Sequence, residues 1–170
     1  MQANRSGWRL FHAAAALALA ACGGGGGGGD PIGPPAANIV GHYTVTHSGT
    51  LSGLSAISCP GEIDITNQTG NSFSGTISVN VTTECEGLAG SGTINGTVTS
   101  GGAFEATITI PALNGLLESL NCTITGGDPA FTGSAGTAGI SASRTIELSC
   151  EIEGDTLETT LEYTVAGPRT

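Results

Sequence analysis

Two of the three histidines of the chain, at positions 42 and 47, are the first candidates for catalytic or metal chemistry. His42 and His47 lie five residues apart in a segment that alternates like a strand, so their side chains are expected on opposite faces. A shared metal ion or a general-base role is therefore not expected, and both rings are predicted to be solvated. The stretch 53–57, GLSAI, lacks the second glycine of a serine-nucleophile elbow.

Carboxylates form two small clusters near predicted strand ends. One pairs Glu84 with Glu86, and the other contains Glu151, Glu153 and Asp155. Carboxylate oxygens are calcium ligands, but strand alternation places each cluster on the outward face, where solvated side chains are the expectation. We predict no metal, no cofactor and no catalytic residue, so an enzyme is the least supported class.

The cysteine at position 22 stands where a covalent modification is expected. It ends the run LAAC at residues 19–22, which follows an alanine-rich apolar segment with two arginines before it. This is the anatomy of an export signal. The apolar segment is too short for a membrane-spanning helix, which needs about 20 residues. Residues 1–21 are therefore predicted to be a cleaved signal peptide.

The run LAAC resembles the lipobox of bacterial lipoproteins, in which an obligatory cysteine receives a diacylglycerol through a thioether. The resemblance implies that Cys22 is lipidated and that the lipid holds the protein in the bacterial cell envelope. Gly23 follows this cysteine in place of an aspartate, which in the enteric scheme of sorting implies the outer membrane. Each acyl methylene contributes about 0.8 kcal/mol, so two or three chains anchor stably.

The chain that follows the signal peptide is strongly acidic. It has no lysine, and two arginines against 14 acidic residues give 2 − 14 = −12. Such a surface repels phosphate backbones and anionic headgroups, so nucleic acid is excluded as a partner. Attachment to the membrane is expected only through the lipid on Cys22.

Setting Cys22 aside leaves four cysteines, an even number that suits two disulfides in an oxidising compartment. The preferred pairing is local, Cys59 with Cys85 and Cys122 with Cys150, and each bridge would contribute about 3 kcal/mol. The first pair flanks one hairpin. A strand around Phe131 would separate the second pair by about 10 Å, beyond disulfide reach unless that strand is displaced. Reduced buried thiols or crosswise pairing are the alternatives.

Residues 22–37 are predicted to be a tether, and residues 38–170 a single all-β domain. Seven glycines and then PIGPP at residues 31–35 fit neither helix nor sheet. Beyond them, alternation of apolar and polar residues recurs, as from Phe73 to Val81. No convincing helical period is present, and residues 113–120 are expected to make one turn at most.

Glycine-containing turns recur, each followed by a large residue expected to point inward. These anchors are Phe73, Phe104, Phe131 and Leu157. They predict four hairpins, at 59–81, 92–110, 117–136 and 145–165, after a first strand at 41–47. An antiparallel meander of about nine strands must protect its edges, so closure into a small β-barrel is favoured, with a β-sandwich as the alternative.

The tripeptide Gly41-His42-Tyr43 opens the first predicted strand. With the meander behind it, this resembles the lipocalin and streptavidin-like barrels, in which a Gly-x-Trp element closes one end. Tyr43 stands where the tryptophan would be. The resemblance further implies a late arginine over the closing aromatic, and Arg144 is the candidate.

Two functions remain from different classes. The preferred one is a non-catalytic structural or interaction module that meets an envelope protein or a glycan, because large inward side chains would fill the barrel and no polar residue is evident among them. The alternative is a barrel that binds a small apolar ligand. An empty interior of several hundred Å³ would favour the alternative, and its cavity would be lined by Phe73, Phe104, Phe131 and Tyr163.

Overall fold

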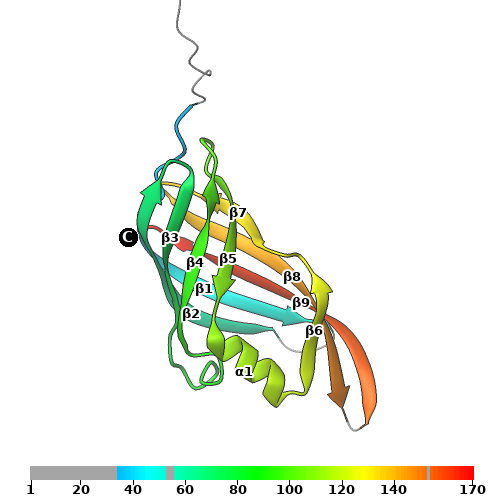
Figure 1. Cartoon of the computed structure of the whole chain (residues 1–170). Helices are drawn as coiled ribbons and strands as arrows, with labels where there is room; N and C mark the ends of the chain where they lie inside the picture. The colour runs from blue at the N-terminus through cyan, green and yellow to red at the C-terminus, as the bar shows by residue number, and fades with distance from the viewer. Residues whose placement is uncertain (1–33, 53–55, 153) are drawn as a thin grey trace, which may run out of the picture. The chain divides into compact units, whose positions relative to one another are not determined.

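The computed structural model describes residues 34–52, 56–152 and 154–170, which form antiparallel strands and one helix (Figure 1). The strands are β1 (Gly41–Leu51), β2 (Ile57–Thr69), β3 (Ser72–Val79), β4 (Gly90–Val98), β5 (Ala103–Thr109), β6 (Cys122–Gly127), β7 (Phe131–Ala135), β8 (Gly139–Ile152) and β9 (Asp155–Pro168). The helix α1 (Pro111–Ser119) lies between β5 and β6.

Eight of these strands close into a barrel. Their order around the wall is β8-β7-β5-β4-β3-β2-β1-β9, and β9 returns to pair with β8. Full closure leaves no exposed edge between the first and last strands of the ring. The predicted all-β barrel is confirmed, and the sandwich alternative is wrong. The ninth strand, β6, pairs only with β8.

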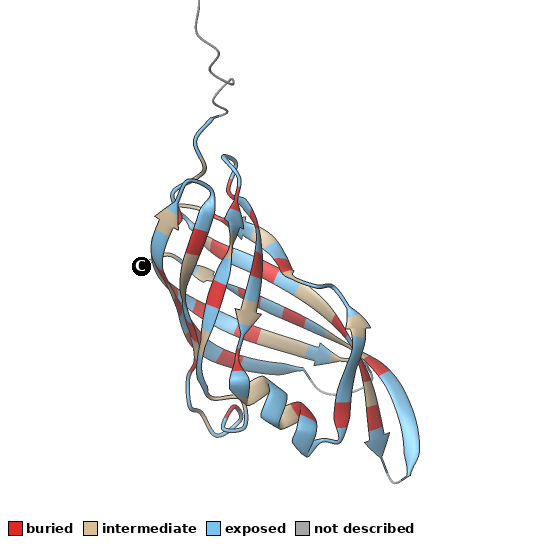
Figure 2. Ribbon diagram, viewed as in Figure 1, coloured by how far each residue is buried: buried red, intermediate tan, exposed pale blue. Residues whose placement is uncertain are grey.

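Alternation along the strands builds the interior. In β1, Tyr43, Val45 and His47 are buried, while Thr44 and Thr46 between them are exposed. The same period of two runs along the other strands, where buried positions alternate with exposed ones (Figure 2). Isoleucines from several strands are almost fully buried, among them Ile63, Ile77 and Ile94. Polar threonines and serines occupy the outer face.

The third predicted hairpin, at 117–136, is wrong. Strands β6 and β7 do not pair with each other, because both lie along one side of β8, end to end. Residues 132–135 of β7 pair with 140–143, and residues 122–127 of β6 pair with 146–150. Between the two strands, Asp128 donates its N–H to the carbonyl of Thr145 at 2.8 Å and accepts from Thr145 N–H at 3.0 Å. The connection thus stays beside β8 instead of reversing the chain.

Because β7 does not lie between β6 and β8, the second disulfide can form. Cys122 stands directly opposite Cys150, with their Cα atoms 4.0 Å apart, and the two are bonded. Cys59 and Cys85 are bonded as well, with a Cα separation of 5.8 Å. The preferred local pairing is confirmed. The expected obstacle is absent because β7 ends before the level of the bridge.

The expectation of one turn at most over 113–120 is wrong. Helix α1 has nine residues and begins with Pro111 in its first turn, where a missing N–H costs nothing. Its leucines are spaced three and four apart, which is a helical period: Leu113, Leu116, Leu117 and Leu120. Packing of this leucine face against one end of the barrel outweighs the low helix propensity of Asn114 and Gly115.

Strands β8 and β9 continue beyond the end of the barrel as a hairpin (Figure 1). Leu157 lies opposite Cys150 in this hairpin and is 45 % exposed. The expectation that Leu157 anchors the core is wrong, although its place in the alternation is right, because no opposite wall remains at that level. The other three anchors, Phe73, Phe104 and Phe131, are buried.

Cleavage at glutamates tests the two bridges, because the domain has no lysine and a glutamate lies between every pair of its neighbouring cysteines. Mass mapping of non-reduced fragments should recover only Cys59 joined to Cys85 and Cys122 joined to Cys150. A fragment that joins Cys59 to Cys122 or Cys150 would show that the register of the barrel is wrong.

Candidate ligand-binding site

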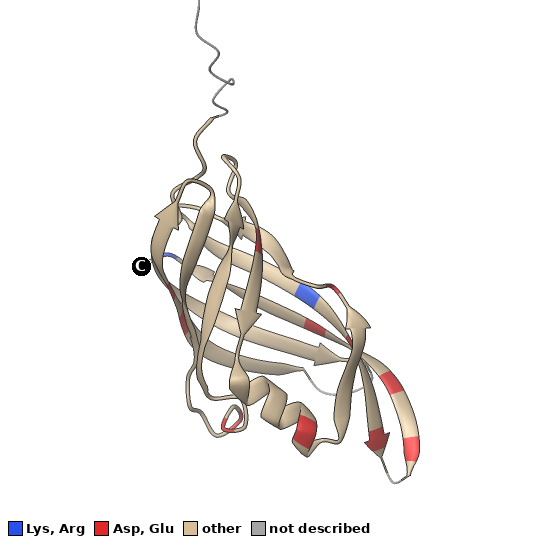
Figure 3. Ribbon diagram, viewed as in Figure 1, with Lys and Arg blue, Asp and Glu red and all other residues tan. Residues whose placement is uncertain are grey.

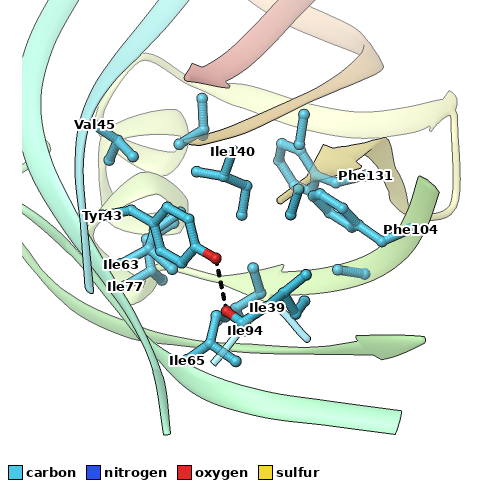
Figure 4. Packing of buried hydrophobic residues seen from close by; sticks show 14 of the residues in the cluster. Ile39, Tyr43, Val45, Ile63, Ile65, Ile77, Ile94, Phe104, Phe131 and Ile140 are labelled. Atoms are coloured by element: carbon cyan, nitrogen blue, oxygen red, sulfur yellow. Dashed lines mark hydrogen bonds between the residues drawn. The ribbon is translucent and has the colours of Figure 1, made fainter. Parts of the chain in front are cut away.

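One end of the barrel is plugged around Tyr43. Its ring is fully buried, and its hydroxyl donates to the carbonyl of Ile39 at 2.7 Å (Figure 4). The guanidinium of Arg169 lies 5.9 Å from the centroid of this ring and donates to the carbonyl of Val40. Burial raises the pKa of Tyr43. The expectation that Arg144 covers the closing aromatic is therefore wrong, because Arg169 takes that place.

The middle of the barrel is filled. Phe73 and Phe104 meet edge to face, with ring centroids 5.8 Å apart, among buried isoleucines and valines. Neither phenylalanine lines the two hollows that the described residues form at the other end.

The other end, covered by α1, contains an almost wholly apolar cavity of about 90 Å³. The leucines of α1 form one wall, and inward residues of β1, β2, β3 and β9 form the rest. Leu88 completes the lining from the loop after β3, and the Cys59–Cys85 bridge ties this loop to β2. The cavity is smaller than the several hundred Å³ that typical ligand sites offer, so its size suits a small molecule or one end of a longer one.

His47 reaches this cavity from β1 and is 3 % exposed. Its Nε2 lies 2.9 Å from the carbonyl oxygen of Ser78, which can only accept, so Nε2 carries the proton. Its Nδ1, 2.7 Å from the hydroxyl oxygen of Tyr163, then accepts from that hydroxyl. Burial lowers the pKa of His47, so the ring is neutral at pH 7. A solvated His47 was expected, and this is wrong.

Gly61 makes room for the ring of His47. A Cβ at this position would lie 2.4 Å from Nε2 and 2.1 Å from the carbonyl oxygen of Ser78. His42, on the outward face of the same strand, instead lies at the surface with its Nδ1 2.7 Å from a carboxylate oxygen of Asp64. The two rings thus point to opposite faces, as alternation predicts.

Tyr163 is the partner of His47 and is 5 % exposed. Burial raises the pKa of its hydroxyl well above the usual range, so it stays neutral and donates to His47. A phenol oxygen that donates one hydrogen bond still has lone pairs to accept another. The pair therefore offers an acceptor, without charge, at the edge of an apolar cavity.

The barrel wall has an opening next to this end. Strand β5 pairs with β7 only over residues 103–106, and none of the described strands pairs with residues 107–109 on that side. A hollow of about 230 Å³ lies here, bordered by β5, the first turn of α1, β6, β7 and β8. Tyr163 and Leu113 line both this hollow and the cavity, so the two adjoin.

Arg144 lies at this opening. It falls between Ala142 and Ile146 in the inward set of β8 and is half-buried. Its guanidinium carbon is 5.9 Å from the centroid of the Phe131 ring, and Phe131 meets Tyr163 edge to face at 5.6 Å. A continuous series of contacts thus runs from the opening to His47.

Of the four residues predicted to line a cavity, the structure brings two to this end of the barrel. Tyr163 lines both hollows and Phe131 lines the side opening, whereas Phe73 and Phe104 lie in the filled middle. The sequence interpretation missed His47, Arg144 and the leucines of α1. A usable signal was present, because His47 continues the alternation of Tyr43 and Val45.

The two acidic clusters predicted from the sequence line neither hollow. Glu84, Glu86, Glu151 and Asp155 are exposed, while Glu153 and Cys22 lie outside the described residues. Within the described ranges, no group of three or more histidine, cysteine or acidic side chains is placed to hold a metal ion. Nor does any helix there have the length and apolar character needed to cross a membrane.

No family model and no curated protein matches this chain. Among solved structures, a redesigned β-barrel, b11L5F_LGL, has a TM-score of 0.47 at 13% identity, over 78% of this chain and 91% of its own. A second, EF1p2_mFAP2b bound to DFHBI, has a TM-score of 0.45 at 12% identity, over 78% of this chain and 94% of its own. Nothing about the function of this chain follows from either likeness.

The lowered pKa of His47 predicts a loss of stability in mild acid. Below about pH 6.5 the unfolded chain protonates this histidine while the folded chain resists, so the free energy of unfolding falls by up to about 1.4 kcal/mol per pH unit until the folded pKa is reached. His47→Gln should remove this part of the loss in urea titrations at about pH 7.5 and 5.5. His42→Gln is the matched control and should leave it in place. An equal acid loss in wild type and His47→Gln would contradict the buried, neutral ring.

Proposed function

We propose that this protein is a lipid-anchored binding protein of the bacterial envelope, whose barrel takes up a small apolar molecule at the end covered by α1. The observation that carries the proposal is the apolar cavity there, with the buried, neutral His47–Tyr163 pair in its lining. Ligand sites combine an apolar wall with a few fixed polar groups in this way.

The cavity of about 90 Å³ is smaller than the several hundred Å³ that would by itself favour ligand binding, so the change of preference rests on the inward polar residues. The interaction module was preferred because no polar residue was evident among the inward set, yet His47, Arg144 and Tyr163 all belong to it. An apolar cavity of about 150 Å³ binds molecules as small as benzene. The cavity of about 90 Å³ is smaller than that and suits a short alkyl chain.

Binding without chemical conversion fits the state of the polar pair. Both ring nitrogens of His47 are engaged, one by Tyr163 and one by the carbonyl of Ser78. A general base needs a pKa near the working pH and a nitrogen within reach of the substrate. The raised pKa of Tyr163 makes it a donor that keeps its proton. We therefore propose a non-catalytic role.

The envelope location rests on the lipobox resemblance at residues 19–22, and the domain is compatible with it. Two disulfides fit an oxidising compartment. The described chain enters at the plugged end of the barrel, so the cavity end lies at the opposite end from this entrance (Figure 1). A ligand could thus reach α1 without passing the point where the chain begins its first strand.

The hairpin of β8 and β9 favours a second candidate function, contact with an envelope protein or glycan. Beyond the barrel, the face that carries the Cys122–Cys150 bridge also exposes Ile124, Ile152 and Leu157. These three residues are 50 %, 50 % and 45 % exposed, respectively. This surface shares Ile124 with the side hollow, whereas Ile152 and Leu157 line neither that hollow nor the apolar cavity.

Lipidation is tested by metabolic labelling with radioactive or alkyne-bearing palmitate in a bacterial host. Wild type should incorporate the label, and Cys22→Ala should not, because the thiol that receives the diacylglycerol is gone. The four other cysteines stay unchanged, so they control for labelling elsewhere. Equal labelling of both proteins would refute anchoring at Cys22.

Ligand binding is tested with hexan-1-ol, titrated calorimetrically into the folded domain. Wild type should bind it saturably. Gly49→Val should weaken binding at least about tenfold, because Gly49 lines the cavity and a branched side chain there, compatible with a strand, fills it.

Gly136→Val is the matched control. Gly136 lies between β7 and β8, and nothing lies within 4 Å of the place where its Cβ would be, so binding should be unchanged. Thermal melts of both variants verify that they fold. Saturable binding that survives in folded Gly49→Val would place the ligand elsewhere, and no binding to wild type would refute the proposed function for this probe class.

A further inference from the structure

We propose that the ligand is a short-chain carboxylate, whose carboxylate binds the guanidinium of Arg144 at the opening in the barrel wall and whose alkyl chain enters the apolar cavity past Tyr163. This inference rests on the proposed function and adds the chemical class of the ligand. Its basis is the position of Arg144, which has no carboxylate oxygen within 4.0 Å among the described residues, because the nearby carboxylate of Asp128 accepts instead from the N–H of Thr145.

Arg144 occupies an unusual position for a charged residue. It lies in the inward set of β8, and its one hydrogen bond within the described ranges runs from Nε to the carbonyl oxygen of Asp128 at 2.7 Å. Across those same ranges, the only ion pair within 4.0 Å is His42 with Asp64. In a chain with 14 acidic residues, this guanidinium therefore has no described carboxylate partner. Buried or half-buried charges are usually paired.

The surroundings hold the guanidinium in place. The ring of Phe131 lies beneath it, and the bond from Nε to Asp128 fixes its direction, which leaves the terminal nitrogens for an anion. A planar guanidinium binds a carboxylate through two parallel hydrogen bonds. Asn114 in the first turn of α1 lines the same hollow, and an amide can donate to a carboxylate.

Helix α1 contributes at the same place. Its first turn lines the hollow, and its N-terminus has no side-chain cap and no acidic residue in the first turn. The positive end of the helix dipole is thus unopposed there, which favours an anion. This contribution is secondary to that of Arg144.

The proposed carboxylate site at Arg144 lies next to the apolar cavity. Arg144 stands directly opposite Tyr163 in the β8–β9 ladder, and opposite residues on one face have Cβ atoms about 5 Å apart. A carboxylate at Arg144 therefore places the next carbons at Tyr163 and Leu113, which line both hollows. The alkyl chain then continues between α1 and β1.

The acidic exterior does not prevent this binding. The carboxylates are spread over exposed positions, notably on the β8–β9 hairpin and α1 (Figure 3). Exposed charges are screened within about 8 Å at physiological salt, whereas a half-buried guanidinium is screened less. The surface charge slows the approach of an anion more than it weakens the bound state.

The test compares hexanoate with hexan-1-ol, which has the same chain length and no charge, at pH 7 by calorimetry on the folded domain. Wild type should bind hexanoate about tenfold more tightly, because a hydrogen-bonded ion pair is added to the same apolar contact. Arg144→Gln should abolish this preference and leave hexan-1-ol within about twofold of wild type. Arg144→Lys, which keeps the charge, should retain part of it.

Arg169→Gln removes the same charge at the plugged end of the barrel and is the charge-matched control, so it should keep the preference. Equal binding of hexanoate and hexan-1-ol to wild type would overturn the assignment of the headgroup while the proposed function stands. Loss of both ligands in folded Arg144→Gln would also overturn it, since Arg144 would then only support Phe131. Failure of wild type to bind either ligand would refute this inference and the proposed function together.

Discussion

The pairing of β8 is the constraint on which the rest of the structure depends. Every N–H and C=O in a barrel wall needs a partner, and β8 finds them along its whole length from β9 on one side. On its other side two short strands, β7 with five residues and β6 with six, share it end to end. Closure of the barrel, the Cys122–Cys150 bridge and the gap beside β5 all follow from this division.

The gap and the cavity make the two ends of the barrel unlike. Around Tyr43 the interior is filled, and Arg169 covers the closing ring. Around Tyr163 the wall is incomplete, α1 covers the end, and the inward side chains include those of His47, Arg144 and Tyr163. The neutral pair of His47 and Tyr163 can be buried in the apolar part because each of its protons has a hydrogen-bond acceptor. The charged Arg144 lies where the wall opens to solvent.

Much of the fold could be predicted from the sequence, because alternation and glycine turns act locally. Three of the four hairpins, barrel closure and the local disulfides followed from them. The failures have a common cause, which is that burial depends on what lies opposite. Leu157 is in the inward register, but it is exposed because no strand lies opposite it at that level among the described residues. Strand β7 pairs with β8 instead of forming a hairpin with β6. The site was missed for a related reason. Alternation put His42 and His47 on opposite faces, yet both rings were predicted to be solvated, and Arg144 was assigned to the closing aromatic from the resemblance rather than from its place in the inward alternation.

The most direct measurement of the central claim is the protonation state of His47 in solution, from long-range proton–nitrogen NMR correlations of its ring. A neutral imidazole with its proton on Nε2 at pH 7, whose two nitrogen resonances shift when hexan-1-ol is added, is the result expected of a ring hydrogen-bonded to Tyr163 and Ser78 at the edge of a ligand cavity. A ring that is protonated on both nitrogens at pH 7, or one that carries its proton on Nδ1 and does not respond to hexan-1-ol, would contradict it.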